Sequence, residues 1–156
     1  MKIEPFLTEQ FFTQYEFSAP HLLASSDCET MSIGDLLQLA GSTLDELGGI
    51  TLGYTESQGD PQLRSQVSGM YTDVDAEDVV ILTSPVEGIY LAMQTLLEPD
   101  DEVVALRPAY DALNNVARHL CGEVSPWNLV ARANQWELDF DQLESIISPQ
   151  TRMIVV

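Results

Sequence analysis

Residues 78–113 alternate between apolar runs and helical patterns, and this alternation constrains the fold more than any other feature of the chain. Residues 79–82 read VVIL, a continuous apolar run typical of a strand buried on both faces of a parallel sheet. Ser84 then suits a helix N-cap, Pro85 the first helical position, and Glu87 the third position of a capping box. The segment therefore predicts a buried strand that leads directly into a capped helix.

The same alternation continues to the end of the sequence. Strands are expected at 79–83, 102–106, 123–127 and 153–156, and helices at 86–97, 110–120 and 140–147, the last capped by Asp139. Strands and helices in alternation predict an α/β fold with a mainly parallel sheet and right-handed crossover connections.

The part of the chain before the sheet follows a largely helical pattern. Four segments are expected in order: an aromatic-rich helix over 6–17, a helix over 33–40 capped by Ser32 and ended by Gly41, a glycine-rich loop over 48–59, and a helix that Asp60 and Pro61 open and that runs to about residue 71. Loops concentrate binding residues, so residues 48–59 are also a candidate contact segment.

Charge and hydropathy exclude several classes of partner. The net charge is −19, from 25 acidic against 6 basic residues, which argues against nucleic acid or an anionic membrane surface. The apolar runs are shorter than the roughly 20 residues that cross a bilayer, and the N-terminus lacks an apolar signal core. Cys28 and Cys121 belong to no metal-binding spacing, so no metal site is expected. We therefore expect a cytoplasmic protein.

The helix that begins at Ser84 is a candidate anion site. Its first N–H groups and the positive end of its dipole point out of the carboxyl edge of the predicted sheet, where α/β proteins place phosphates. Ser84, Val86 and Glu87 are the candidate residues, acting chiefly through backbone N–H groups. The alternative is a well-capped helix without a ligand, because capping boxes occur in many proteins.

Four motifs carry a resemblance to a known family. They are the segment GYTESQGDPQLR (53–64), similar to Y-x-x-x-x-G-x-x-x-L-R; SPVEGI (84–89), similar to a phosphate loop; DDEVV (100–104), similar to a GDEV strand entry; and RPAY (107–110), similar to a P-x-aromatic turn. In this order they resemble the N-terminal portion of fold-type I enzymes that depend on pyridoxal 5'-phosphate (PLP), specifically class I/II aminotransferases. The resemblance covers essentially the whole chain.

The resemblance implies a PLP site and a fold. Ser84, Val86 and Glu87 would bind the cofactor phosphate, Tyr110 would stack on the pyridine ring, and Tyr54 would reach the partner's phosphate across a homodimer. Tyr110 alternatively packs on its neighbours, and Tyr54 is alternatively a surface loop residue. Residues 1–71 would be an N-terminal arm and small-domain or dimer-contact segment, and 72–156 the first part of the PLP-binding large domain.

The resemblance also implies groups that this sequence does not carry. The family's Schiff-base lysine lies later in its chains, whereas Lys2 is the only lysine here and lies outside any matching motif. No catalytic residue is therefore assigned. The sequence also stops within the apolar run 153–156, so we expect the N-terminal part of a longer aminotransferase that is inactive alone.

Two other functions remain open at this point. A nucleotide-binding α/β domain would also place its ligand at the strand edge, although the first turn lacks G-x-G-x-x-G. A non-catalytic interaction protein or dimer partner built on the same fold suits the missing lysine. In the aminotransferase interpretation, the complete enzyme would act on an amino acid and a 2-oxo acid.

Overall fold

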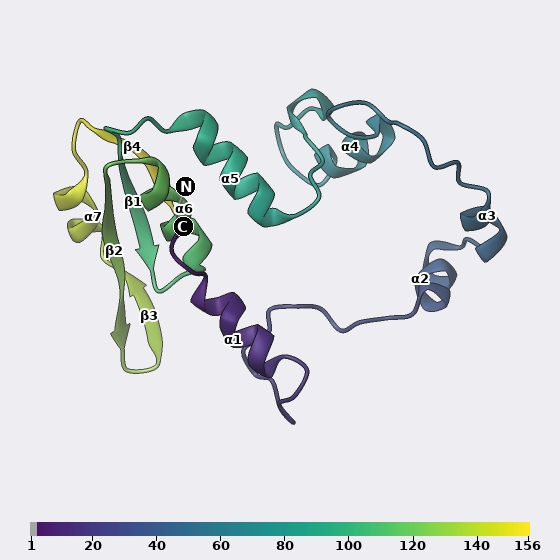
Figure 1. Ribbon diagram of the computed structural model, residues 1–156, viewed down its shortest axis with the longest axis horizontal. Helices are drawn as coiled ribbons and strands as arrows, with labels where there is room; N and C mark the ends of the chain where they lie inside the picture. Colours follow the sequence, from purple (N-terminus) through teal and green to yellow (C-terminus); the bar gives the residue numbers. More distant parts are fainter. Residues whose placement is uncertain (1–2) are drawn as a thin grey trace. The chain divides into compact units, whose positions relative to one another are not determined.

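The computed structural model describes residues 3–156, and Lys2 therefore lies outside the described residues. The chain forms two compact units. We call the residues up to Pro20 together with Leu82–Val156 the sheet unit, and His21–Ile81 the helical unit (Figure 1). The division at residue 71 concerns the domains of a complete enzyme and stays a prediction.

The sheet unit is built on four strands, β1 (Glu102–Arg107), β2 (Glu123–Arg132), β3 (Gln135–Leu138) and β4 (Thr151–Val155). The strand order is β3-β2-β1-β4. The central strand β1 pairs in parallel with both β2 and β4, whereas β2 and β3 form an antiparallel hairpin. The expected α/β fold with a mainly parallel sheet is thus confirmed.

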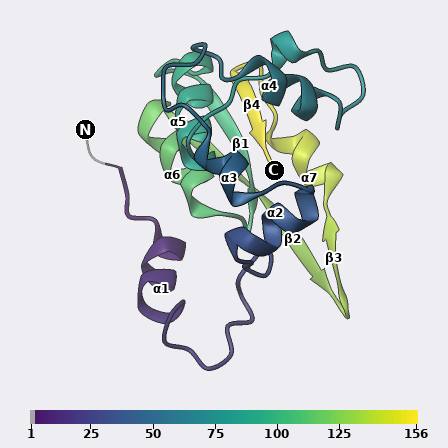
Figure 2. The ribbon, with the colours of Figure 1, turned by 90° about the vertical axis from the view of Figure 1, so that its right-hand side faces the viewer.

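Helices cover both faces of this sheet. In Figure 2, α5 (Pro85–Leu96) and α6 (Asp111–Leu120) lie on one side, and α7 (Phe140–Ile146) lies on the other. Asp139 caps α7 by accepting a hydrogen bond from the Gln142 N–H at 2.8 Å, as the sequence predicts. None of the helices among residues 3–156 is long and apolar enough to span a membrane.

Adjacent residues of β1 pack on opposite faces of the sheet. Val103 and Val104 are both fully buried and, as neighbours in a strand, point to opposite faces of the sheet. Val103 packs in a cluster with Met93, Val116, Ala117 and Cys121 from the α5–α6 side. A continuous apolar run is therefore required at β1, because neither face of this strand meets water.

The helical unit follows the local sequence signals closely. It contains α2 (Ile33–Ala40), α3 (Leu44–Gly48), α4 (Pro61–Ser68) and a 3-10 turn, η1 (Ala76–Asp78). Ser32 caps α2, and Gly41 ends it with a φ of 66°. Asp60 caps α4 with Pro61 at its start, and residues 49–59 form no helix or strand. The predicted caps are confirmed, although α4 ends three residues before 71.

Helix α3 was not expected from the sequence. Thr43 and Glu46 form a capping box in which each side chain accepts a hydrogen bond from the other residue's backbone N–H. The T-x-x-E signal was present in the sequence. The glycines at 48 and 49 limit the helix to a single short turn, which is too short to give a recognisable helical pattern of apolar residues.

The strand predicted at residues 79–83 is wrong. These residues form no ladder with any strand among the described residues, and the chain bends at Thr83. Val80 is 52% exposed, so the segment is not buried on both faces. An apolar β-branched run indicates strand propensity, but a strand forms only where a neighbouring strand pairs with it, and here the Ile81 N–H donates to the Gln58 carbonyl oxygen in a loop.

Candidate functional site

At the start of α5 the predicted Ser84 cap and Pro85 are confirmed, whereas the predicted capping box is wrong in its second half, because Glu87 does not accept the Ser84 N–H. Ser84 is the N-cap, its Oγ accepts a hydrogen bond from the Glu87 N–H at 3.3 Å, and Pro85 occupies the first turn. The helix is twelve residues long, so its dipole is fully developed at this end. The start of α5 is therefore capped even though no strand precedes it.

The Glu87 side chain bonds to the residue before the N-cap, one position earlier in the chain than in a capping box. Its Oε2 accepts a hydrogen bond from the Thr83 N–H at 2.8 Å, rather than from the N–H of the N-cap residue Ser84. The carboxylate is consequently directed toward backbone N–H groups before the helix, and part of its charge is compensated there. Glu87 is thus a capping residue, and any anion at this helix start would lie near a carboxylate that is already hydrogen-bonded.

Open donors remain at the same helix start. Among residues 3–156, the Ser84 and Val86 N–H groups have no hydrogen-bond partner, and the Ser84 hydroxyl donates to none. Pro85 between them has no N–H. Two backbone donors and one hydroxyl at a helix N-terminus form an arrangement suited to an oxyanion.

Tyr110 lies at the start of the neighbouring helix. It occupies the N-cap position of α6, directly after the turn that follows β1. In Figure 1 the start of α6 follows the carboxyl end of β1, and α5 lies beside α6. Both helix starts thus belong to the sheet unit, and within residues 3–156 no hydrogen bond joins Ser84, Val86 or Glu87 to Tyr110.

The Tyr110 hydroxyl is anchored by the N-terminal arm. It donates a hydrogen bond to Glu9 Oε1 at 2.5 Å, and Glu9 belongs to the helix α1 (Leu7–Tyr15). This bond to Glu9 raises the pKa of Tyr110 to about 12, with burial and the charge of Asp111 adding to the effect. The ring is half-buried and is held at both ends, by its backbone in the β1–α6 turn and by its hydroxyl.

The arm itself is attached to α6 by polar contacts. The N-cap residue Phe6 offers no side-chain cap to α1, and Asp111 Oδ2 instead accepts hydrogen bonds from the Leu7 and Thr8 N–H groups. Asn115 Nδ2 donates to the Pro5 carbonyl oxygen at 3.0 Å. Phe6 packs against the apolar cluster of the sheet unit. Helix α1 confirms the helix expected over 6–17.

Sequence reasoning missed Glu9 and Asp111 as neighbours of the site. Asp111 carries the usual signal of an acidic residue in the first turn of a helix, α6. Its carboxylate, however, caps the first turn of a different helix more than 100 positions away in the chain. No local pattern encodes that contact, because it depends on where the arm folds back.

Replacing Glu9 with Gln is expected to return the pKa of Tyr110 toward the ordinary value of 10, because the acceptor charge is lost. Folded protein holds the phenol proton more tightly than unfolded protein, so the bond contributes stability below pH 10 that disappears as pH rises through about 12. Tyrosinate absorbance measured against pH reports the change, with Tyr110→Phe identifying the transition. An unchanged late transition in the Glu9→Gln protein would contradict the assigned contact.

Replacing Asp111 with Ala is expected to detach the start of α1, because two charge-assisted acceptor bonds are lost. Bonds of this kind stabilise by about 1.5–3 kcal/mol. Asp141→Ala is the matched control, since Asp141 is also an acidic residue in the first turn of a helix, α7, and has no hydrogen bond from α1. Amide exchange of Leu7 and Thr8 should accelerate in the first variant alone. Equal exchange rates in both variants would show that Asp111 does not hold the arm.

Tyr54 belongs to the helical unit. Its side chain is fully exposed and has no hydrogen-bond partner among the described residues. The structure holds a single chain, so the role expected across a dimer interface stays a prediction.

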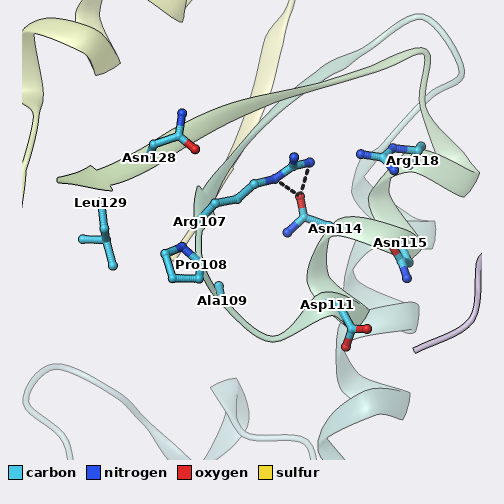
Figure 3. Close-up of a pocket in the computed structure, with 9 residues that line it drawn as sticks. All are labelled: Arg107, Pro108, Ala109, Asp111, Asn114, Asn115, Arg118, Asn128 and Leu129. Carbon is cyan, nitrogen blue, oxygen red and sulfur yellow. Dashed lines mark hydrogen bonds between the residues drawn. The ribbon is translucent and has the colours of Figure 1, made fainter. Parts of the chain in front are cut away.

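A separate pocket of about 460 Å³ lies on the sheet unit between β1, α6 and β2 (Figure 3). Its lining comprises Arg107, Pro108, Ala109, Asp111, Asn114, Asn115, Arg118, Asn128 and Leu129. None of the cofactor residues expected from the sequence lines it. No group of metal-binding side chains is present in this pocket or elsewhere in residues 3–156.

Comparisons with known proteins agree with this architecture. Residues 22–156 match the family model of aminotransferase class I and II. The chain is 30% identical to capreomycidine synthase from Streptomyces vinaceus, over 95% of this chain and 38% of that protein. It is 36% identical to aspartate aminotransferase from Pyrococcus horikoshii, over 66% of this chain and 27% of that protein. The chain thus spans well under half the length of these relatives.

Solved structures show the same relationship. A PLP-dependent aminotransferase from Streptococcus suis superposes with a TM-score of 0.87 and 29% sequence identity, over 99% of this chain and 42% of that chain. These similarities do not favour a nucleotide-binding domain or a non-catalytic interaction protein. The family model matches most of the sequence, and the chain therefore belongs to the aminotransferase class I and II family.

Proposed function

We propose that the protein serves PLP-dependent transfer of an amino group between an amino acid and a 2-oxo acid. The observation that carries the proposal is the family match over residues 22–156. The relative from Streptococcus suis is described as PLP-dependent, which supports the choice of cofactor. When bound, PLP supplies an electron sink for the reacting amino acid, and the protein supplies binding and orientation.

The start of α5 would hold the cofactor phosphate. The Val86 and Ser84 N–H groups and the Ser84 hydroxyl are the donors without partners at this helix start. Glu87 would act indirectly, since its carboxylate accepts the Thr83 N–H and keeps the turn before the helix in place. A capped helix start with free donors fits a phosphate, although it offers fewer N–H groups than a loop without Pro85.

Tyr110 would orient the cofactor ring. Stacking of a phenol ring on a flat heteroaromatic ring contributes about 0.5–1.5 kcal/mol beyond burial. The hydrogen bond to Glu9 restricts rotation of the Tyr110 side chain, so its ring needs little reordering when a second ring stacks on it. This arrangement fits an aromatic cofactor whose phosphate lies at the neighbouring helix start.

The complete assembly would be a cytoplasmic homodimer. Tyr54 is exposed on the helical unit and would donate its phenol to the phosphate bound by a partner chain. Residues 1–71 would supply the arm and dimer contacts, and 72–156 the first part of the cofactor domain. Sedimentation that gives only a monomer at all concentrations would remove the role of Tyr54.

Titration with pyridoxamine 5'-phosphate tests the site, because this cofactor form cannot react with Lys2. The phosphorylated compound is expected to bind at least about tenfold more tightly than pyridoxamine, since charge-assisted bonds stabilise by about 1.5–3 kcal/mol. Tyr110→Ala should weaken binding of both compounds, whereas the exposed Tyr71 replaced with Ala should not. Equal affinity for the two compounds, or equal effects of the two variants, would contradict the proposal.

The 156-residue chain alone is expected not to accelerate amino transfer. Its only lysine is Lys2, which belongs to no matching motif. Production of 2-oxo acid from aspartate and PLP should therefore equal that of PLP alone in solution. After borohydride reduction, a modified amine should be found only at Lys2 or at the N-terminus.

A further inference from the structure

The pocket shown in Figure 3 gathers positive charge that the chain does not neutralise. Arg107 and Arg118 both line it, although the whole chain has only 6 basic residues against 25 acidic ones. Neither guanidinium pairs with a carboxylate, since the only ion pair within residues 3–156 joins Arg132 to Glu137. Two unpaired cations in one pocket are unexpected in a chain of this composition unless something else compensates them.

Arg107 is oriented by a neutral partner. Its Nε and Nη2 atoms donate to Asn114 Oδ1 at 3.1 and 2.9 Å, and Asn114 is itself only 8% exposed. An amide fixes the direction of the guanidinium without cancelling its charge. Keeping a half-buried charge without a counter-charge is unfavourable, and the remaining N–H groups of Arg107 are free to bind one.

Helix α6 brings the second arginine to the same place. Arg118 follows Asn114 by four positions, so the two side chains lie on one face of the helix. In Figure 3 the Arg107 and Arg118 guanidinium groups lie on the same side of the pocket, and the Asp111 carboxylate is directed away from both. That carboxylate already accepts the Leu7 and Thr8 N–H groups.

We infer that this pocket binds a small ligand through an oxyanion, a carboxylate or a phosphate, held by Arg107 and Arg118. The guanidinium fork matches both groups in geometry. Asn128 from β2 adds an amide side chain that has no partner among the described residues. The volume of about 460 Å³ suits a small molecule. Neither Ser84 nor Tyr110 lines the pocket, so the inference is independent of the proposed cofactor site.

Calorimetric titration of the 156-residue chain with succinate and, separately, with inorganic phosphate tests the inference. The unaltered chain should bind at least one of them, and the better ligand identifies the oxyanion class. Arg118→Gln should weaken that binding about tenfold or more, because a charge-assisted contact is lost. Arg132→Gln removes the same charge from the exposed β2–β3 hairpin and should change the affinity less than about twofold. No binding of either compound, or equal loss in both variants, would overturn the inference.

Two further variants separate this pocket from the start of α5. Arg107→Lys keeps the charge but loses the fork, and it should weaken binding about tenfold if the contact is bidentate. Its circular dichroism spectrum shows whether it is folded, and Arg118→Gln changes an exposed side chain that has no hydrogen-bond partner among residues 3–156. Phosphate bound at the start of α5, the proposed cofactor site, would be lost in Ser84→Ala, whereas binding that is lost in Arg118→Gln belongs to the pocket. Binding of both succinate and phosphate that is retained in Arg118→Gln and lost in Ser84→Ala would place the anion at α5 and overturn the inference.

Discussion

Replacing Trp127 with Ala is expected to lower the free energy of unfolding by about 3–5 kcal/mol. Trp127 is 3% exposed, and its ring packs against Phe140 with centroids 5.6 Å apart. Its Nε1–H donates to the Asp139 carbonyl oxygen at 2.7 Å, beside the residue that caps α7. The substitution opens a cavity between β2 and α7 and removes the indole hydrogen bond, while the Asp139 carbonyl oxygen still accepts the Leu143 N–H at 3.1 Å.

Trp136 provides the matched control for Trp127. It is 62% exposed on β3, so its replacement with Ala removes an indole without opening a cavity. The expected loss is below about 1 kcal/mol. Urea unfolding followed by circular dichroism measures both variants. A similar loss for the two tryptophans would contradict the layered packing of α7 on the sheet.

Replacing Gly59 with Ala is expected to destabilise the helical unit by about 2–4 kcal/mol, from backbone strain and a steric clash together. The φ of Gly59 is 104°, a conformation that residues with a side chain rarely adopt. An added Cβ would lie 2.6 Å from the Ile81 Cβ, and the chain is fixed there because the Ile81 N–H donates to the Gln58 carbonyl oxygen at 2.8 Å. Thermal unfolding and amide exchange of Ile81 measure the effect.

Gly53 is the control for Gly59, since both lie in the same loop segment. An added Cβ at Gly53 would meet nothing within 4 Å, and its φ is not positive. Gly53→Ala is therefore expected to be neutral or slightly stabilising, by up to about 1 kcal/mol. Faster exchange of Ile81 in Gly53→Ala than in Gly59→Ala would contradict the close contact.

Local signals in the sequence predicted the helices well. Ser32 with Gly41, Asp60 with Pro61, and Ser84 with Pro85 mark helix ends that the structure confirms. These signals succeed because a cap forms within three residues of the helix end and depends little on the rest of the fold. The start of α5, and with it the candidate phosphate site, was predictable for the same reason.

Strand pairing was less predictable because it depends on distant residues. The β2–β3 hairpin extends β2 to Arg132, beyond the strand predicted over 123–127, and it turns at Ala133 with a φ of 47°. Alanine rarely adopts this conformation. The turn also has none of the Asn-Gly or Asp-Gly signals that mark tight hairpins, so the sequence did not predict it. The strand prediction at residues 79–83 was wrong for the opposite reason: their β propensity is high, but no partner strand is present among the described residues.

The contacts around Tyr110 could not be predicted from the sequence pattern either. Glu9 contacts Tyr110 across 101 positions, and Asn115 contacts Pro5 across 110. Arg107 and Asn114 are close in sequence, but their pairing depends on the turn between β1 and α6. Each of these contacts follows from the tertiary fold, which motif matching does not supply.

Amide chemical-shift mapping with pyridoxamine 5'-phosphate tests the central claim most directly, that this chain carries a cofactor site at the start of α5. The account predicts the largest shifts at the Ser84 and Val86 N–H groups, together with changes in the Tyr110 ring. Shifts confined to the Arg107 and Arg118 pocket, or no shifts at cofactor concentrations that saturate relatives of this family, would contradict it.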